Sequence, residues 1–197
     1  MQDSLFAQPP DEPAETLDAL NAELLQRAKR MPQFKDRIFV LGEGRPGLRV
    51  AVVGESPGPP DIESGRPFMG PAGQMLERIL AAIGLKRDDC YLTNVVKYIS
   101  TGDEMTSEVL SFFTPYLHRE LRAARPRVVV AFGNTPTRAI LNTKKPISQL
   151  RGEFHDYHGA SLMPTFNPAY LLRDPSKKRE VWEDMKKVRD LLAKEPA

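Results

Sequence analysis

Two residues in this sequence combine the properties needed to hold a flat, polar ligand. They are Glu55 and Phe68, an acid and an aromatic ring on one long loop. The loop follows residues 50–53, an apolar and largely β-branched run that predicts a strand buried on both faces. Glu55 therefore lies at the carboxyl end of that strand, where open α/β sheets bind their ligands. A nucleobase would suit such a loop. The alternative is an ordinary strand-to-helix connection, although these usually take about 2–6 residues.

Helix and strand patterns alternate along the chain and place this loop in an α/β fold. We expect helices at residues 16–31, 72–83, 107–123, 135–141 and 176–192, and strands at 50–53, 90–97, 127–132, 153–157 and 161–165, with a possible edge strand at 38–40. The alternation predicts a three-layer αβα sandwich around a central, mostly parallel, four-stranded sheet. Residues 1–13 are predicted to form a flexible tail, and residues 14–197 a single domain.

The composition restricts what the protein can be. A hydrophobic share of 41% in 197 residues supports one folded core, and a net charge of +2 means that any basic nucleic-acid surface is local. Cys90 is the only cysteine, which excludes a disulfide framework and a cysteine-based zinc site. His118, His155 and His158 do not share a ligand pattern with other metal-binding residues, so no metal is expected. No long apolar run or leader is visible, and we expect a cytoplasmic monomer.

Residues 54–68 read GESPG, then Asp61, then GRPF, and this order resembles motif 1 of the uracil-DNA glycosylase superfamily in its family-four type. That motif reads GEAPG, acidic residues and GRPF. The likeness covers most of the chain. It implies a DNA repair enzyme that flips a nucleotide out of DNA and hydrolyses the N-glycosidic bond of uracil. Residues 55–68, Asn94 and residues 167–173 should then meet at the carboxyl edge of the sheet.

The resemblance assigns roles to the residues of the base pocket. Phe68 matches the ring that stacks on uracil, and Asn94 the amide that pairs with uracil O4 and N3–H. Glu55 matches the acid that orients water or stabilises the developing sugar cation, with Ser56 beside it in the pocket and Asp61 as a second catalytic candidate. Simpler interpretations stay open: Phe68 as a core ring, Asn94 as a turn residue and Asp61 as a solvated loop acid.

Residues 167–173 read NPAYLLR and resemble motif 2, which in family four reads HPAYLLR. Asn167, a catalytic and uracil-binding candidate, stands where the family's histidine donates to uracil O2, and an amide is a weaker donor. Mismatch-directed thymine and uracil glycosylases carry an NPS-type motif here. Leu171 or Leu172 would enter the gap left by a flipped base, or would pack in the core. The residues expected to bind DNA phosphates, each otherwise a solvated surface charge, are Arg151, Arg173, Lys177 and Lys178.

A second difference from family four concerns its iron–sulfur cluster, which is held by four cysteine thiolates. The corresponding positions here are Ala28, Met31, Tyr98 and Phe113. All four are apolar or aromatic. We therefore expect a branch that has no cluster and no other cofactor, in which side-chain packing takes the place of the cluster.

The N-terminal tail contains a short segment with a resemblance of its own. Gln2, Leu5 and Phe6 follow the pattern of the peptide by which bacterial replication and repair proteins hold the sliding clamp. A mobile terminus can fold onto the groove of a partner. A tail without function is the alternative.

Two classes of function stay open. The first is a glycosylase that removes uracil, or another deaminated base, from DNA. The second is a catalytically weak or inactive protein of the same fold that binds DNA or a replication partner. Glu55, Phe68 and Asn94 favour the enzyme. Asn167, the missing cysteines and the altered loop at 99–106 favour the binding protein.

Overall fold

The computed structural model describes residues 15–98 and 105–194. The clamp-like segment with Gln2, Leu5 and Phe6, and most of the loop at 99–106, lie outside the described residues. The helices and strands, in chain order, are α1 (Leu17–Lys29), β1 (Val50–Gly54), α2 (Pro59–Ser64), α3 (Pro71–Ala82), the 3₁₀ turn η1 (Arg87–Asp89), β2 (Cys90–Asn94), α4 (Ser107–Ala124), β3 (Val128–Phe132), α5 (Asn134–Leu141), α6 (Ile147–Leu150), β4 (His155–Tyr157), β5 (Ala160–Thr165), α7 (Pro168–Arg173), η3 (Pro175–Lys177) and α8 (Lys178–Lys194).

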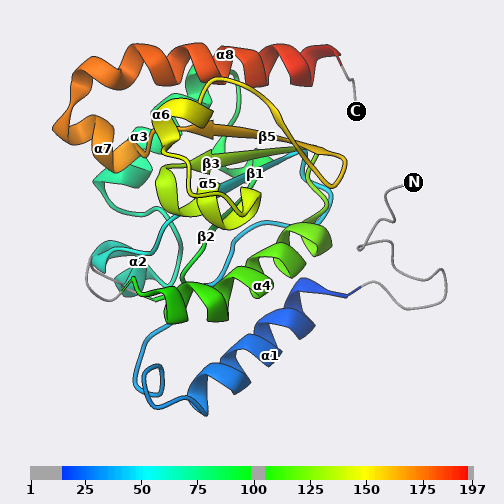
Figure 1. The fold of residues 1–197 in the computed structure, drawn as a ribbon, viewed down its shortest axis with the longest axis vertical. Coiled ribbons are helices and arrows are strands. Elements are labelled where there is room, and N and C mark those ends of the chain that lie inside the picture. Colours follow the sequence, from blue (N-terminus) through cyan, green and yellow to red (C-terminus); the bar gives the residue numbers. More distant parts are fainter. Residues whose placement is uncertain (1–14, 99–104, 195–197) are drawn as a thin grey trace.

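Five strands form one sheet in the order β2-β1-β3-β5-β4 (Figure 1). Strands β2, β1, β3 and β5 are parallel, and β4 runs antiparallel to β5. The predicted sandwich around a mostly parallel sheet is confirmed, but the expected number of four strands is too low. The fifth strand is β4, which lies within the strand expected at 153–157, is 3 residues long and joins the edge of the sheet through a hairpin with β5.

Alternate residues of the strands face opposite helical layers. Ala51 and Val53 belong to a core with α1 and α4, whereas Val50 and Val52 belong to a core with α3 and α8. Figure 1 shows α1 and α4 on one side of the sheet and α8 on the other. Because both faces are covered, β1 and β3 are buried at every position, which explains their continuous apolar sequences. Among the helices of the described residues, none is long and apolar enough to cross a membrane.

The segment at 38–40 is not the edge strand that its apolar residues suggest. Ile38 is 64% exposed, and the segment reaches the sheet region through a backbone hydrogen bond from Val40 N to Lys97 O. Pairing with β2 is limited to one antiparallel bridge, between Glu43 and Leu92. A single bridge cannot build a strand, so the chain crosses β2 here and does not extend the sheet.

Two short helices occupy segments whose composition predicts loops. Helix α2 lies within the connection after β1, where Asp61 caps its first turn and Gly65, with a φ of 70°, ends it. Helix α6 lies within the basic segment at 144–152. Helices of one turn are too short to show an apolar period, so the sequence could not reveal them. Strand β2 ends at Asn94, three residues earlier than expected.

Candidate active site

The carboxyl ends of β1 and β3 flank the point at which the strand order reverses. The chain passes from β1 to β2 on one side and from β3 to β5 on the other, which makes the crevice between them the expected ligand site of an open α/β sheet. Glu55 follows β1, and Thr135 lies in the first turn of α5 after β3. Thr135 Oγ1 donates to Glu55 Oε2 at 2.5 Å. This hydrogen bond joins the segments that follow β1 and β3 and holds the half-buried Glu55 carboxylate in one orientation.

Asn94 and Phe68 face the same glycine from different segments. Gly54 and Asn94 are cross-strand neighbours at the ends of β1 and β2. A Cβ atom built on Gly54 would lie 2.3 Å from Asn94 Oδ1 and 2.8 Å from Phe68 Cζ. Asn94 is 3% exposed, so its amide is held deep in the site. The fold thus brings together the amide and the ring that the sequence singled out, beside Glu55 and its neighbour Ser56.

Phe68 occupies an unusual backbone conformation. Its φ of 59° lies in the left-handed region, which an aromatic residue seldom adopts. Its carbonyl oxygen approaches α3 so closely that a Cβ on Gly73 would lie 1.7 Å from it. The surrounding structure must therefore hold this residue in place, and such strain is typical of functional loops.

Asp61 is bound to the backbone of the same loop. Its carboxylate accepts hydrogen bonds from Gly58 N at 3.0 Å and from Met69 N at 2.6 Å. The side chain is 6% exposed, so its interpretation as a solvated loop acid is wrong. Because its two oxygens bind amides on either side of α2, Asp61 holds the two ends of this part of the loop together.

Asn167 follows β5 and caps α7. Its Oδ1 accepts from Ala169 N at 2.8 Å, so the amide nitrogen Nδ2 is the group that can donate to a ligand. Gly133, which follows β3 with a φ of 103°, lies beside it, and a Cβ there would lie 3.6 Å from Asn167 Nδ2. Asn167 is therefore at the same sheet edge as Glu55 and Asn94.

The candidate DNA-binding residues divide into exposed and internally bound groups. Leu171 is 1% exposed and belongs to the core with α3 and α8, whereas Leu172 is 46% exposed. The wedge expected from this pair therefore falls to Leu172. Arg173, at the end of α7, and Lys178, at the start of α8, are exposed as well.

Two other cations of that group already have carboxylate partners. Arg151 binds Asp184 at 2.5 Å and Glu180 at 3.2 Å, and is 18% exposed. Lys177 pairs with Glu180 at 2.7 Å. These contacts tie the α6 region and η3 to α8, and they reduce the charge that either residue can offer to a phosphate.

A buried polar network lies behind Asn94, and sequence reasoning missed it. Lys97 and Glu120 are 1% and 2% exposed, and their ion pair measures 2.6 Å from Nζ to Oε2. Lys97 Nζ also donates to the carbonyl of Asn94 at 2.7 Å. Glu120 Oε1 accepts from Tyr91 and Thr93 hydroxyls at 2.7 and 2.9 Å. The one available signal was a lysine directly after an apolar strand.

The four positions that correspond to family-four cysteines come together in one apolar cluster. Ala28, Tyr98 and Phe113 are buried in the core beside α1 and α4, and Met31 packs against it. The ring centroids of Tyr98 and Phe113 lie 5.9 Å apart, and the Phe34 ring is tilted against both, at 5.6 and 5.4 Å. None of these side chains can supply a thiolate, so the set does not fit an iron–sulfur cluster. Within the described residues, no group of three or more His, Cys, Asp or Glu is placed to hold a metal.

The family model named "Uracil DNA glycosylase superfamily" matches residues 41–186, and this chain belongs to that superfamily. A Type-4 uracil-DNA glycosylase of Thermotoga maritima is 34% identical over 187 residues, which cover 92% of this chain and 97% of the relative. Type-4 uracil-DNA glycosylases of Saccharolobus solfataricus and Sulfurisphaera tokodaii are 33% and 31% identical, with 80% and 90% of this chain covered and 77% and 85% of theirs. The resemblance to family four is confirmed.

Proposed function

We propose that this protein is a DNA glycosylase that hydrolyses the N-glycosidic bond of uracil after the nucleotide has been flipped out of the DNA. The observation that carries the proposal is the placement of an amide, Asn94, and an aromatic ring, Phe68, around the bare backbone of Gly54, beside the fixed carboxylate of Glu55. A flipped base needs these three elements: a ring to stack on, an edge to pair with, and a polar group near its sugar.

The pocket selects uracil through hydrogen bonds to one edge of the base. The Asn94 amide donates to O4 and accepts from N3–H, whereas cytosine presents the opposite pattern at these two atoms. Phe68 stacks on the base, and stacking of this kind contributes roughly 1–3 kcal/mol per base. Because Lys97 holds the Asn94 carbonyl, the strand end that carries the amide is fixed from behind.

Glu55 and Asn167 act on the bond that breaks. As the bond between C1′ and N1 opens, its electron pair moves to the uracil ring, and positive charge develops on the sugar. The Glu55 carboxylate, oriented by Thr135, stabilises that charge, directs water to C1′ and accepts the proton that the water loses as its oxygen bonds to C1′. Asn167 Nδ2 donates to uracil O2, where negative charge accumulates. As a neutral amide, Asn167 stabilises that charge less than a polarised histidine would, so we expect a modest rate.

The surface at α7 and the start of α8 would bind the DNA around the flipped nucleotide. Leu172 is exposed and adjacent to the crevice through the short helix that Asn167 caps, so it would fill the gap in the base stack. Arg173 and Lys178 would contact phosphates.

We further propose that residues 2–6 hold a sliding clamp. Deletion of the residues before Glu12 should then abolish clamp binding and leave excision from short oligonucleotides unchanged, and equal binding would exclude this role.

Substitutions of Asn167 test the enzyme directly. We expect Asn167→His to raise the single-turnover rate of uracil removal, and Asn167→Ala to lower it, because the loss of a donor that stabilises developing charge costs roughly 2.7–4 kcal/mol. Asn167→Asp is the matched control, since a carboxylate keeps the cap on α7 but cannot donate. It should fold with unchanged stability and excise more slowly than wild type.

The assay uses labelled single- and double-stranded oligonucleotides that carry uracil, a uracil mismatch or hypoxanthine, cleaved by alkali after reaction. If only the hypoxanthine oligonucleotide is cleaved, the substrate is that deaminated base and not uracil. The second candidate function is a DNA- or partner-binding protein of the glycosylase fold, favoured by Asn167 in the place of histidine. No cleavage by wild type or by any of the three variants, with DNA binding preserved, would exclude the enzyme and leave this candidate.

A further inference from the structure

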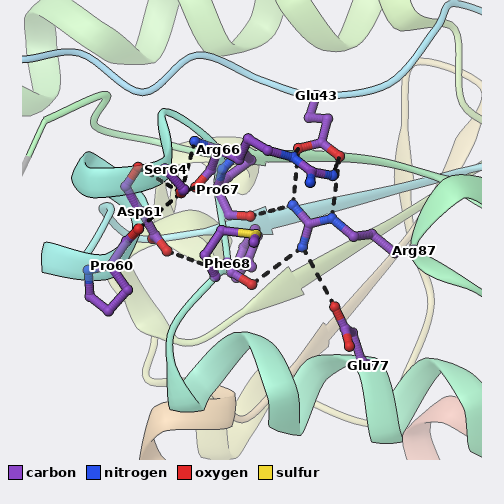
Figure 2. Close-up of polar contacts among 10 residues, drawn as sticks. Glu43, Pro60, Asp61, Ser64, Arg66, Pro67, Phe68, Glu77 and Arg87 are labelled. Atoms are coloured by element: carbon purple, nitrogen blue, oxygen red, sulfur yellow. Dashed lines mark hydrogen bonds and ion pairs between the residues drawn. The ribbon is translucent and has the colours of Figure 1, made fainter.

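Arg87 binds the backbone carbonyls of Pro67 and Phe68 (Figure 2). Its guanidinium donates from Nη2 to the Pro67 carbonyl at 2.5 Å and from Nη1 to the Phe68 carbonyl at 3.3 Å. Arg87 comes from η1, on another part of the chain, and its side chain is 12% exposed. A rigid, planar donor thus spans two consecutive carbonyls next to the ring.

Glu43 holds the other edge of the same guanidinium. It accepts from Arg87 Nε at 3.2 Å and Nη2 at 3.0 Å, and also from Arg66 Nε at 2.9 Å and Nη2 at 2.7 Å. The two arginines lower the pKa of Glu43 from 4.5 to about 2, with the hydrogen bond from Arg66 as the largest cause. The carboxylate is therefore charged at neutral pH.

We call the paired side chains of Arg87 and Glu43 the clamp. Both residues are attached to β2, the strand that carries Asn94. Glu43 exchanges two backbone hydrogen bonds with Leu92, both 2.8 Å long, and Leu92 lies two residues before Asn94 on β2. Arg87 lies three residues before the start of β2. Both halves of the clamp are thus fixed to β2, and through them the Phe68 backbone is fixed relative to the Asn94 amide.

We propose that Arg87, oriented by Glu43, is a positioning residue that sets the Phe68 ring at its working distance from the Asn94 amide. The proposal rests on the proposed function, since it gives the ring and the amide a common ligand. The left-handed backbone of Phe68 explains why a clamp is needed, because an aromatic residue relaxes from this conformation unless its neighbours hold it. An ordinary surface ion pair would not explain the two hydrogen bonds to carbonyls beside the ring.

The test compares Arg87→Gln with Glu77→Gln in single-turnover excision of uracil from single-stranded DNA. Glu77 is the matched control, because it approaches Arg87 Nη1 at 3.9 Å, is 53% exposed, and belongs to α3 outside the clamp. We expect Arg87→Gln to slow excision by about tenfold or more, the scale of charge-assisted hydrogen bonds that hold a reacting geometry. Glu77→Gln should excise at the wild-type rate. If Arg87→Gln does not fold, Glu43→Gln removes the charge of the clamp at a more exposed position and takes its place.

A double variant separates positioning from general damage. In a Phe68→Ala background the clamp has no ring to position, so Arg87→Gln should reduce excision further by less than about twofold. An equal factor in both backgrounds, or wild-type excision by Arg87→Gln, would overturn the proposal. Arg87→Lys keeps the charge and one donor, and should recover part of the rate.

Hydrogen exchange supplies a readout that does not depend on activity. The amides of residues 65–70 should exchange faster in Arg87→Gln than in wild type, whereas those of the β3 core should not change. If the wild-type protein has no glycosylase activity, the proposed function fails, and hydrogen exchange alone then tests whether Arg87 holds the Phe68 backbone. Unchanged exchange at residues 65–70 in Arg87→Gln would overturn that role, and faster exchange would support it.

Discussion

Gly54 shows how much the candidate site depends on a missing side chain. The residue ends β1 between the Asn94 amide and the Phe68 ring, and a single methyl group there would overlap both. The amide and the ring therefore pack directly against this bare backbone, and a side chain at residue 54 would displace both of them.

Gly54→Ala should reduce uracil excision by about 10²-fold, since displacement of a binding group by about 1 Å can cost that much. Gly58→Ala is the matched control in the same loop, because its Cβ would meet Pro60 Cδ at an ordinary 3.8 Å. The measurement is single-turnover excision together with the melting temperature of each variant. If Gly54→Ala excises uracil at the wild-type rate, the base does not bind against the Asn94 amide and the Phe68 ring.

At the scale of elements, α4 and β2 are joined by a buried ion pair directly behind the site. Lys97 continues from β2, and Glu120 lies on α4, 23 residues along the chain. Burial of two charges is costly, and such a pair is retained only when hydrogen bonds satisfy both partners. The hydroxyls of Tyr91 and Thr93 and the Asn94 carbonyl complete that set.

Lys97→Met should lower the free energy of unfolding by about 3–5 kcal/mol, because it leaves the Glu120 carboxylate buried without its cation. In the double variant Lys97→Met with Glu120→Gln, the neutral amide still accepts from both hydroxyls, and much of the stability should return. Urea unfolding of wild type, the single variant and the double variant measures this. Equal stability of the single and double variants would contradict a dominant cost from the unpaired carboxylate.

At the scale of the whole molecule, aromatic packing surrounds the four positions that the resemblance matches to cluster cysteines. Phe34, in the segment after α1, contacts Phe113 of α4 and Tyr98 of the chain between β2 and α4 through ring contacts of 5.4 to 5.9 Å. Two-ring contacts of this kind contribute about 0.5–1.5 kcal/mol beyond area burial. None of these side chains carries a thiol.

We therefore expect purified protein to be colourless, to contain no stoichiometric iron, and to melt at the same temperature with and without a chelator. Metal analysis and thermal unfolding provide the measurement. A brown preparation with about four irons per chain, the content of a [4Fe–4S] cluster, would contradict this expectation.

The sequence by itself determined the positions of the buried strands and of the residues at their carboxyl ends. Continuous apolar runs identify strands covered on both faces, and parallel strands bring Glu55, Asn94 and Asn167 to one edge whatever the side chains between them do. The apolar runs can be read directly from the order of residues, and the motif resemblance added the roles that we propose for the residues at the strand ends.

Only the tertiary structure decided which side chains face the core and which partners the charges have. Adjacent leucines at 171 and 172 are equivalent by composition, yet one is 1% and the other 46% exposed, because α7 rotates one of them into the core. Arg87 and Glu43 are 44 residues apart, and Asp61 binds amides on both sides of a helix that no periodicity revealed. Ion pairs and caps of this kind depend on distances in space, and a sequence read one segment at a time carries no measure of those distances.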